Sequence, residues 1–223
     1  AARAARDLRC VIITGTGACF SAGADFRSVI QRDDGDGPAQ APHERSFAMY
    51  QPFLSVLDLD VPVIGALNGH AVGGGFGLAL ATDIRVGARG GRYGANFARL
   101  GLHPGMAISY LLPRLVGVAR AAELLFTGRL IDGAEAERIG LLASVHDGPE
   151  VLPAARALAA AIAANAPLAV RETKRSLYRG LGWDPRGAAY AEAFAQAESL
   201  ATADAAEGIA ALLEKREPRF TGR

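Results

Sequence analysis

The sequence has little of what marks a secreted, a membrane or a nucleic-acid-binding protein. It contains two cysteines, Cys10 and Cys19, among 223 residues, which is too few for a disulfide framework and fits a reducing cytosol. No uninterrupted apolar run approaches the ~20 residues of a membrane span, and no secretory signal is visible. A formal net charge of +1, with basic residues scattered along the chain, gives no electrostatic basis for binding nucleic acid or an anionic membrane. We therefore expect a cytoplasmic protein that binds neither nucleic acid nor membrane.

The composition changes along the chain and predicts two regions. In residues 1–148, short apolar runs alternate with helix-like stretches, which is typical of an α/β core. Residues 149–223 are rich in alanine, have helical periodicity and show almost no strand character. The chain begins with AARAARDLR, without an initiator methionine or a capping residue. We therefore expect that an N-terminal part of the core is missing.

The expected elements of the core follow from these apolar runs. Strands are predicted at 10–14, 61–67 and 84–88, with shorter ones near 92–95 and 145, and residues 15–23 are predicted to form a loop. Helices are predicted at 46–57, 107–117 and 119–126, and Asp132 is expected to cap a further short helix. Four more helices are predicted at 151–164, 167–179, 187–203 and 204–215.

The stretch VPVIGALNGHAVGGGFGLALA, residues 61–81, organises the rest of the core. Its first residues predict a buried strand, Asn68 and Gly69 a turn, and Gly73 to Gly75 the start of an apolar helix of about ten residues. The first N–H groups of a helix have no intrahelical partner, so they favour an anion or a developing oxyanion. Close packing of the glycine backbone, with no ligand, is the alternative and stays open at this point.

A second glycine-bearing loop, FSAGAD at 20–25, also follows an apolar strand. If the two strands are neighbours in one sheet, both loops emerge at the same edge. One backbone N–H group from each loop can then point at a single oxygen atom. Two such donors suit a thioester, whose carbonyl becomes enolate-like when charge develops on the α-carbon.

Five segments of this chain resemble the crotonase (enoyl-CoA hydratase/isomerase) superfamily, in the family's order. They are CVIITGTGACFSAGAD at 10–25, VPVIGALNGHAVGGGFGLALATDIRVGA at 61–88, LGLHPGMAISYLLPRLVG at 100–117, TGRLIDGAEAERIGLLASV at 127–145 and EGIAALLEKREPRF at 207–220. The resemblance implies a spiral of ββα turns with a C-terminal helical trimerisation region, assembled as a homotrimer or hexamer. It also implies an acyl-CoA thioester as the ligand and a link to fatty acid metabolism. Coenzyme A is then part of the substrate, and no separate cofactor or metal is expected.

The resemblance also assigns roles to individual residues. The two oxyanion-hole donors are the backbone N–H groups of Ala24 and Gly74, and the ammonium of Lys215 reaches the CoA of a neighbouring subunit. A solvated lysine on a terminal helix is the alternative for Lys215. The loop residues implied to line the CoA are Ala22, Asp25 and Phe26, although Asp25 can equally fix its loop through backbone hydrogen bonds.

The sequence departs from the family at the two positions where hydratases carry glutamates, which are Gly77 and Phe97 here. Neither side chain can exchange a proton, and general acid–base chemistry typically contributes ~10²–10⁴ in rate. His103, in the turn GLHPG, is a weak candidate for a substitute base, and the favoured interpretation is a turn histidine that bonds backbone. His70 is expected to pack against the core, and Asn96 either orients a polar acyl group or serves as turn material.

These observations predict an acyl-CoA-binding enzyme of enoyl-CoA hydratase/isomerase type, a lyase or isomerase by descent, with little ordinary hydration. A family decarboxylase or thioester hydrolase that depends on polarising the thioester fits the same residues. A non-catalytic acyl-CoA-binding protein is the alternative from another class. A purely structural trimer is the least favoured, since structure alone does not require both glycine-bearing loops.

Overall fold

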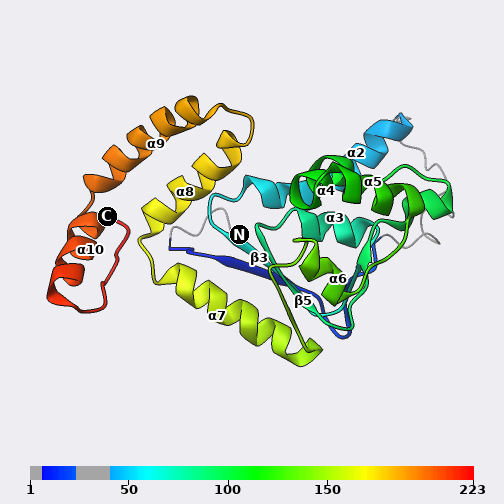
Figure 1. Ribbon diagram of the computed structural model, residues 1–223, viewed down its shortest axis with the longest axis horizontal. Helices are drawn as coiled ribbons and strands as arrows, with labels where there is room; N and C mark the ends of the chain where they lie inside the picture. Colours follow the sequence, from blue (N-terminus) through cyan, green and yellow to red (C-terminus); the bar gives the residue numbers. More distant parts are fainter. Residues whose placement is uncertain (1–6, 24–40) are drawn as a thin grey trace, which may run out of the picture. The chain divides into compact units, whose positions relative to one another are not determined.

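The computed structural model describes residues 7–23 and 41–223 of the chain (Figure 1). Within these residues the fold is α/β, with two small sheets and a series of helices. The predicted fold class is confirmed.

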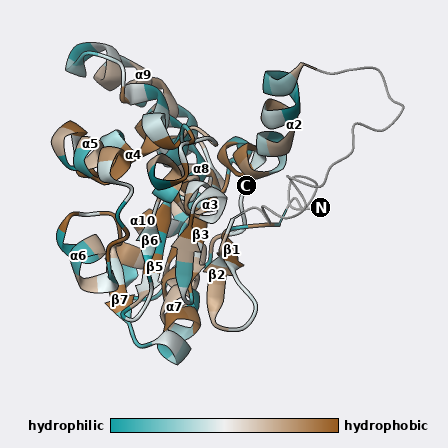
Figure 2. Ribbon diagram, turned by 90° about the vertical axis from the view of Figure 1, so that its right-hand side faces the viewer, coloured by the Kyte–Doolittle hydropathy of each residue, from teal (hydrophilic) through white to brown (hydrophobic). Residues whose placement is uncertain are grey.

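The first sheet has four strands in the order β1-β3-β5-β7. Their bounds are Val11–Thr14 (β1), Val63–Leu67 (β3), Ile84–Ala88 (β5) and Ser144–His146 (β7). Strands β3 and β5 are parallel, as are β5 and β7. All five residues of β3 are buried, which explains why its sequence is a continuous apolar run rather than an alternating one (Figure 2). Strands β1 and β3 are neighbours in this sheet, so the condition set for the strands at 10–14 and 61–67 is met.

The second sheet has three strands in the order β2-β4-β6, at Cys19–Ser21, His70–Val72 and Tyr93–Gly94. Both pairs are parallel, with Cys19 opposite His70 and Ala71 opposite Tyr93. The prediction of a loop through residues 15–23 is wrong at β2, and β4 was missed. Each of these strands has only three residues, with small or polar side chains among them, so neither gives a hydrophobic period that can be recognised.

Helices and short 3₁₀ turns connect the strands. They are α2 (Pro42–Leu54), η2 (Ser55–Asp58), α3 (Gly74–Leu80), η3 (Asn96–Leu100), α4 (Ile108–Val116), α5 (Val118–Thr127), α6 (Gly133–Arg138) and η4 (Gly148–Glu150). Helices α3 and α4 lie side by side, and their buried faces share one hydrophobic core with Tyr93 (Figure 1). The predicted cap of α6 is confirmed, because the Asp132 carboxylate accepts a hydrogen bond of 2.8 Å from the N–H of Glu135.

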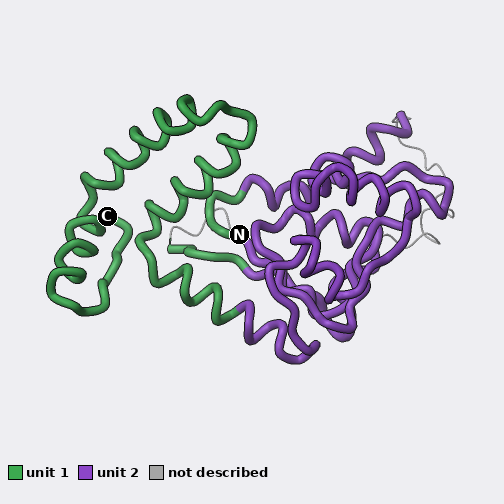
Figure 3. The backbone as a smooth tube through the Cα atoms, viewed as in Figure 1, with its two compact units in different colours: residues 1–11, 59–62, 156–223 green, residues 12–58, 63–155 purple. Residues whose placement is uncertain are grey.

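The described chain divides into two compact units (Figure 3). We call residues 12–58 and 63–155 the core unit, and residues 1–11, 59–62 and 156–223 the helical unit. Helix α7 (Val151–Ala163) runs from the first into the second. The predicted domain boundary at residue 148 stays a prediction.

The helical unit contains α8 (Pro167–Gly180), α9 (Pro185–Leu200) and α10 (Ala203–Glu214). Buried Asp204 holds the C-terminal residues against α10, since its carboxylate accepts hydrogen bonds from the N–H groups of Thr221 and Gly222, at 2.7 and 2.8 Å. Among the described residues no single helix is long and apolar enough to cross a membrane. One bent pair, 148–163 with 167–180, passes that test by length and composition alone.

Candidate functional site

A cavity of about 440 Å³ lies in the core unit, where β2 and β4 end. Parallel neighbouring strands end at the same edge of a sheet, so the segments that follow β2 and β4 meet there. Helix α2, turn η3 and the loop before α4 complete the wall. The lining residues are Ser21, Ala22, Gly23, Ser46, Met49, Tyr50, Phe53, Val72, Gly73, Gly74, Gly75, Asn96, Phe97, Leu102, His103, Gly105 and Met106. The two glycine-bearing loops thus lie together, as the sequence predicts.

The backbone turns sharply at Gly73, which has φ +58° and ψ −123°, a conformation that suits glycine. The Gly73 N–H donates to the carbonyl oxygen of Gly94 at 3.0 Å. The next N–H group, that of Gly74, makes no hydrogen bond to any residue in the described part of the chain. A Cβ atom on Gly23 would lie only 2.9 Å from the Gly74 nitrogen, so the two loops approach each other closely. Gly74 therefore brings an uncommitted donor to the cavity wall.

Helix α3, which begins at Gly74, has seven residues. The expected length of about ten residues is wrong, because the chain turns at Ala81 to enter β5. A helix of two turns has a weak macrodipole. The Gly74 N–H group therefore acts as a single positioned donor rather than as the end of a long helix dipole.

Gly77 is buried, and Met106 covers it. A Cβ atom on Gly77 would lie 2.8 Å from the Cβ atom of Met106 and 3.3 Å from its terminal methyl group. Phe97 lines the cavity, and its side chain offers no oxygen. The described lining residues include no aspartate or glutamate. The described part of the wall around Gly74 therefore supplies no carboxylate to move a proton.

His103 lines the cavity as an exposed side chain. It makes no hydrogen bond to any residue that the structure describes, so the expected bond to turn backbone is absent there. His70 is not among the lining residues; its Nδ1 atom accepts a hydrogen bond from the N–H of Arg92 at 3.0 Å. Its side chain is exposed, so the expected packing against the core is wrong.

Comparison with known proteins decides the family. The family model described as enoyl-CoA hydratase/isomerase matches residues 1–223. The chain belongs to the enoyl-CoA hydratase/isomerase family.

Individual relatives agree with this assignment. The chain is 38% identical to YngF of Bacillus subtilis over 218 residues, which covers 97% of this chain and 82% of that protein. It is 37% identical to the mitochondrial enoyl-CoA hydratase domain-containing protein 2 of Bos taurus, over 97% of this chain and 73% of that protein. The crystal structure of enoyl-CoA hydratase from Bacillus anthracis matches with a TM-score of 0.91 at 34% identity, over 99% of this chain and 84% of that one.

Only some of the family residues expected in the cavity belong to the described part of the chain. Ala22 lines the cavity beside Gly23, whereas Ala24, Asp25 and Phe26 lie outside the described residues. Lys215 belongs to the helical unit, where it is exposed and ends α10 with φ +56°. No group of three or more His, Cys, Asp or Glu side chains that could hold a metal ion is found within residues 7–23 and 41–223.

The described side chains with shifted pKa values lie outside the cavity wall. Burial raises the pKa of Tyr93 to about 12, and the Tyr93 hydroxyl donates to the carbonyl oxygen of Ala88, so this group stabilises the core. Hydrogen bonds from Arg129 lower the pKa of Glu123 and of Glu135, which join α5 to α6. None of these side chains lines the cavity, so each has a structural role.

Tyr50 is the lining residue whose position sequence reasoning missed. A tyrosine on an apolar helix stripe is ordinarily part of a core. The spacing predicts one such stripe, made of Phe47, Tyr50, Phe53, Leu54 and Leu57. The structure instead places Tyr50 in the cavity wall. Tyr50 contacts Gly105, which lies 55 positions further along the chain, and no local pattern in the sequence predicts that contact.

The contact between Gly77 and Met106 generates a prediction about stability. Gly77→Ala should lower the free energy of unfolding by about 1–3 kcal/mol, although alanine is the better helix former, because the new methyl group overlaps Met106. Met106→Gly removes that side chain at a position with φ +56°, which glycine adopts freely. Urea unfolding of a double-mutant cycle should therefore show that Gly77→Ala costs at least about 1 kcal/mol less in the Met106→Gly background. Equal costs in both backgrounds would contradict the contact.

Proposed function

We propose that the cavity binds an acyl-CoA thioester, with its carbonyl oxygen at the Gly74 N–H group. The observation that carries this proposal is the uncommitted Gly74 donor in an otherwise largely apolar wall. A carbonyl oxygen placed there is polarised, and negative charge that develops on it is stabilised. Ala24, the residue after Gly23, is the proposed second donor.

We further propose that this member catalyses a hydratase/isomerase-type reaction with little ordinary hydration. Gly77 and Phe97 occupy the two positions that the family resemblance assigns to glutamates, and neither can hold the water or transfer its proton. Catalysis then depends on polarisation of the thioester, while a bound water or a group of the substrate moves the proton. Decarboxylation and thioester hydrolysis are compatible with such a site.

A non-catalytic acyl-CoA-binding role is the second candidate. The specific observation in its favour is that the described cavity wall contains no carboxylate.

The Gly74 donor can be tested by removing it alone. Proline is tolerated at the first position of a helix and has no N–H group, so Gly74→Pro deletes the donor at such a position. Gly74→Ala retains the donor and is the matched control. Butyryl-CoA and S-butyl-CoA differ only in the thioester carbonyl, so calorimetry with both ligands isolates its contribution.

We expect the wild-type protein and Gly74→Ala to bind butyryl-CoA about tenfold more tightly than S-butyl-CoA, which is the value of one good hydrogen bond. In Gly74→Pro the preference for butyryl-CoA should fall, because only the proposed Ala24 donor remains. A preference for butyryl-CoA that is undiminished in Gly74→Pro would show that the carbonyl lies elsewhere. Thermal unfolding of each variant verifies that it is folded.

Product analysis separates the enzyme from the carrier. We expect incubation with crotonyl-CoA to give little 3-hydroxybutyryl-CoA. The hydration rate should be lower by about 10²–10⁴ than that of an enzyme with general acid–base groups in place. Brisk hydration would contradict the assignment of Gly77 and Phe97. If crotonyl-, 3-hydroxybutyryl- and malonyl-CoA all bind and all remain unchanged, the carrier role is supported.

We also propose that the chain forms a homotrimer in which Lys215 reaches the CoA bound to a neighbouring subunit. The support is the set of exposed apolar side chains in the helical unit: Leu177, Leu181, Trp183, Tyr190, Phe194, Leu200, Ile209, Leu212 and Leu213. Apolar surface on this scale favours burial against other copies. Light scattering coupled to gel filtration should give a particle of three chains, or of six if trimers pair. A monomer at micromolar concentration would refute the assembly.

A further inference from the structure

The described lining residues of the cavity include five polar side chains, and two of these are already hydrogen-bonded. The Ser46 hydroxyl donates to the carbonyl oxygen of Pro42 at 3.2 Å, and the Ser21 hydroxyl accepts from the N–H of Gly23 at 3.4 Å. The other three are Tyr50, Asn96 and His103, and none of them makes a hydrogen bond to a residue in the described part of the chain. Tyr50 and Asn96 are half-buried, so part of their hydration is already lost.

The Tyr50 hydroxyl lies against the backbone of Gly105. The aromatic ring projects from α2 onto Gly105, where any Cβ atom would overlap the hydroxyl oxygen. Glycine at position 105 therefore allows the phenol to reach the loop that closes the cavity before α4. The hydroxyl ends there without a protein partner among the described residues.

Asn96 lies on another part of the wall, beside the oxyanion donor. Its Oδ1 atom is 3.8 Å from the place where a Cβ atom on Gly73 would lie, and Gly73 immediately precedes Gly74. A ligand whose carbonyl is bound by the Gly74 N–H group therefore passes close to the Asn96 amide.

An alkyl chain in this cavity would displace water from both groups without replacing the lost hydrogen bonds. A buried polar group left unpaired in this way costs free energy, whereas a ligand with a hydrogen-bonding group of its own avoids the cost. The described lining residues include no lysine, arginine, aspartate or glutamate. A neutral polar group is therefore favoured over a carboxylate, which would lose its hydration without gaining a cationic partner among the described lining residues.

We propose that Tyr50 and Asn96 recognise a neutral polar group, a hydroxyl or a carbonyl, on the acyl chain of the bound CoA ester. This inference rests on the proposed function, because it assumes that an acyl-CoA occupies the cavity. CoA esters of oxygenated acyl chains are then the substrate class of this protein, and Tyr50 is a specificity-determining residue.

Two pairs of ligands test the proposal, and in each pair one oxygen atom or hydroxyl replaces one methyl group. The first pair is 3-hydroxybutyryl-CoA with 3-methylbutyryl-CoA, and the second is 4-oxopentanoyl-CoA with 4-methylpentanoyl-CoA. Calorimetry should show that at least one oxygenated ester binds about tenfold more tightly than its apolar counterpart. Tyr50→Phe should reduce that ratio below about threefold and leave the affinity for the apolar ester unchanged.

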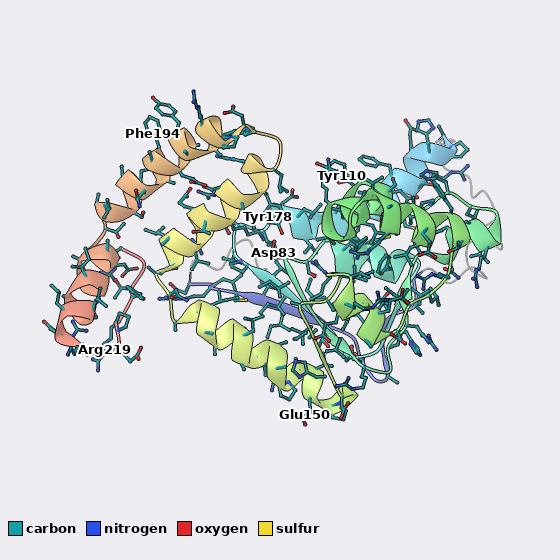
Figure 4. All side chains as sticks on the ribbon, viewed as in Figure 1. Asp83, Tyr110, Glu150, Tyr178, Phe194 and Arg219 are labelled. Atoms are coloured by element: carbon teal, nitrogen blue, oxygen red, sulfur yellow. The ribbon has the colours of Figure 1, made fainter. Side chains whose placement is uncertain are left out.

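Tyr110→Phe is the matched control, since it removes the same hydroxyl from a side chain of α4 (Figure 4). This side chain is 58% exposed and does not line the cavity. This variant should retain the wild-type ratio. Equal binding within both pairs, or a ratio that Tyr50→Phe leaves unchanged, would overturn the inference and leave the proposed function standing. Glutaryl-CoA that binds more tightly than all four esters would overturn the choice of a neutral group. If none of these esters binds, the proposed function fails as well.

Discussion

The parallel pairing of β2 with β4 is the constraint on which the cavity depends. These strands are three residues long, yet they bring together two loops separated by about fifty positions in the sequence. Glycine conformations at the two strand ends, φ +87° at Gly23 and +58° at Gly73, then turn both loops sharply. The Gly73 N–H group completes the sheet by bonding Gly94, and the Gly74 N–H group is left for a ligand. The edge of this sheet thus supplies a hydrogen-bond donor from the backbone alone.

This arrangement separates polarisation from proton transfer. Backbone donors depend on the path of the chain, so they persist while side chains around them change. Met106 covers Gly77, and Phe97 places a ring in the wall, so both positions contribute apolar surface to the cavity or its support. The polar groups that remain, Tyr50, Asn96 and His103, are suited to recognising a neutral ligand. In the proposed function the backbone therefore holds the thioester, while Gly77 and Phe97 supply no acid–base group.

The sequence predicted most of the scaffold because long apolar runs and helical periods are local signals. Strand β3, the Asp132 cap and the four C-terminal helices follow from such signals, and glycines that follow apolar runs located the two glycine-bearing loops. The short strands β2 and β4 have no comparable period, so the second sheet was not predicted. Contacts between distant residues were also inaccessible: nothing in the sequence shows that Met106 covers Gly77 or that Tyr50 reaches Gly105. His103 lines the cavity, whereas its expected bond to backbone is not found among the described residues.

We propose above all that the Gly74 amide polarises a bound thioester carbonyl. Infrared difference spectroscopy of the protein with butyryl-CoA, labelled with ¹³C at the thioester carbonyl, measures that polarisation directly. We expect the carbonyl stretch of the bound ester to move to lower frequency than in water, because a fixed donor weakens the C=O bond. A bound ester whose carbonyl stretch stays at or above its frequency in water would show that Gly74 does not polarise the carbonyl.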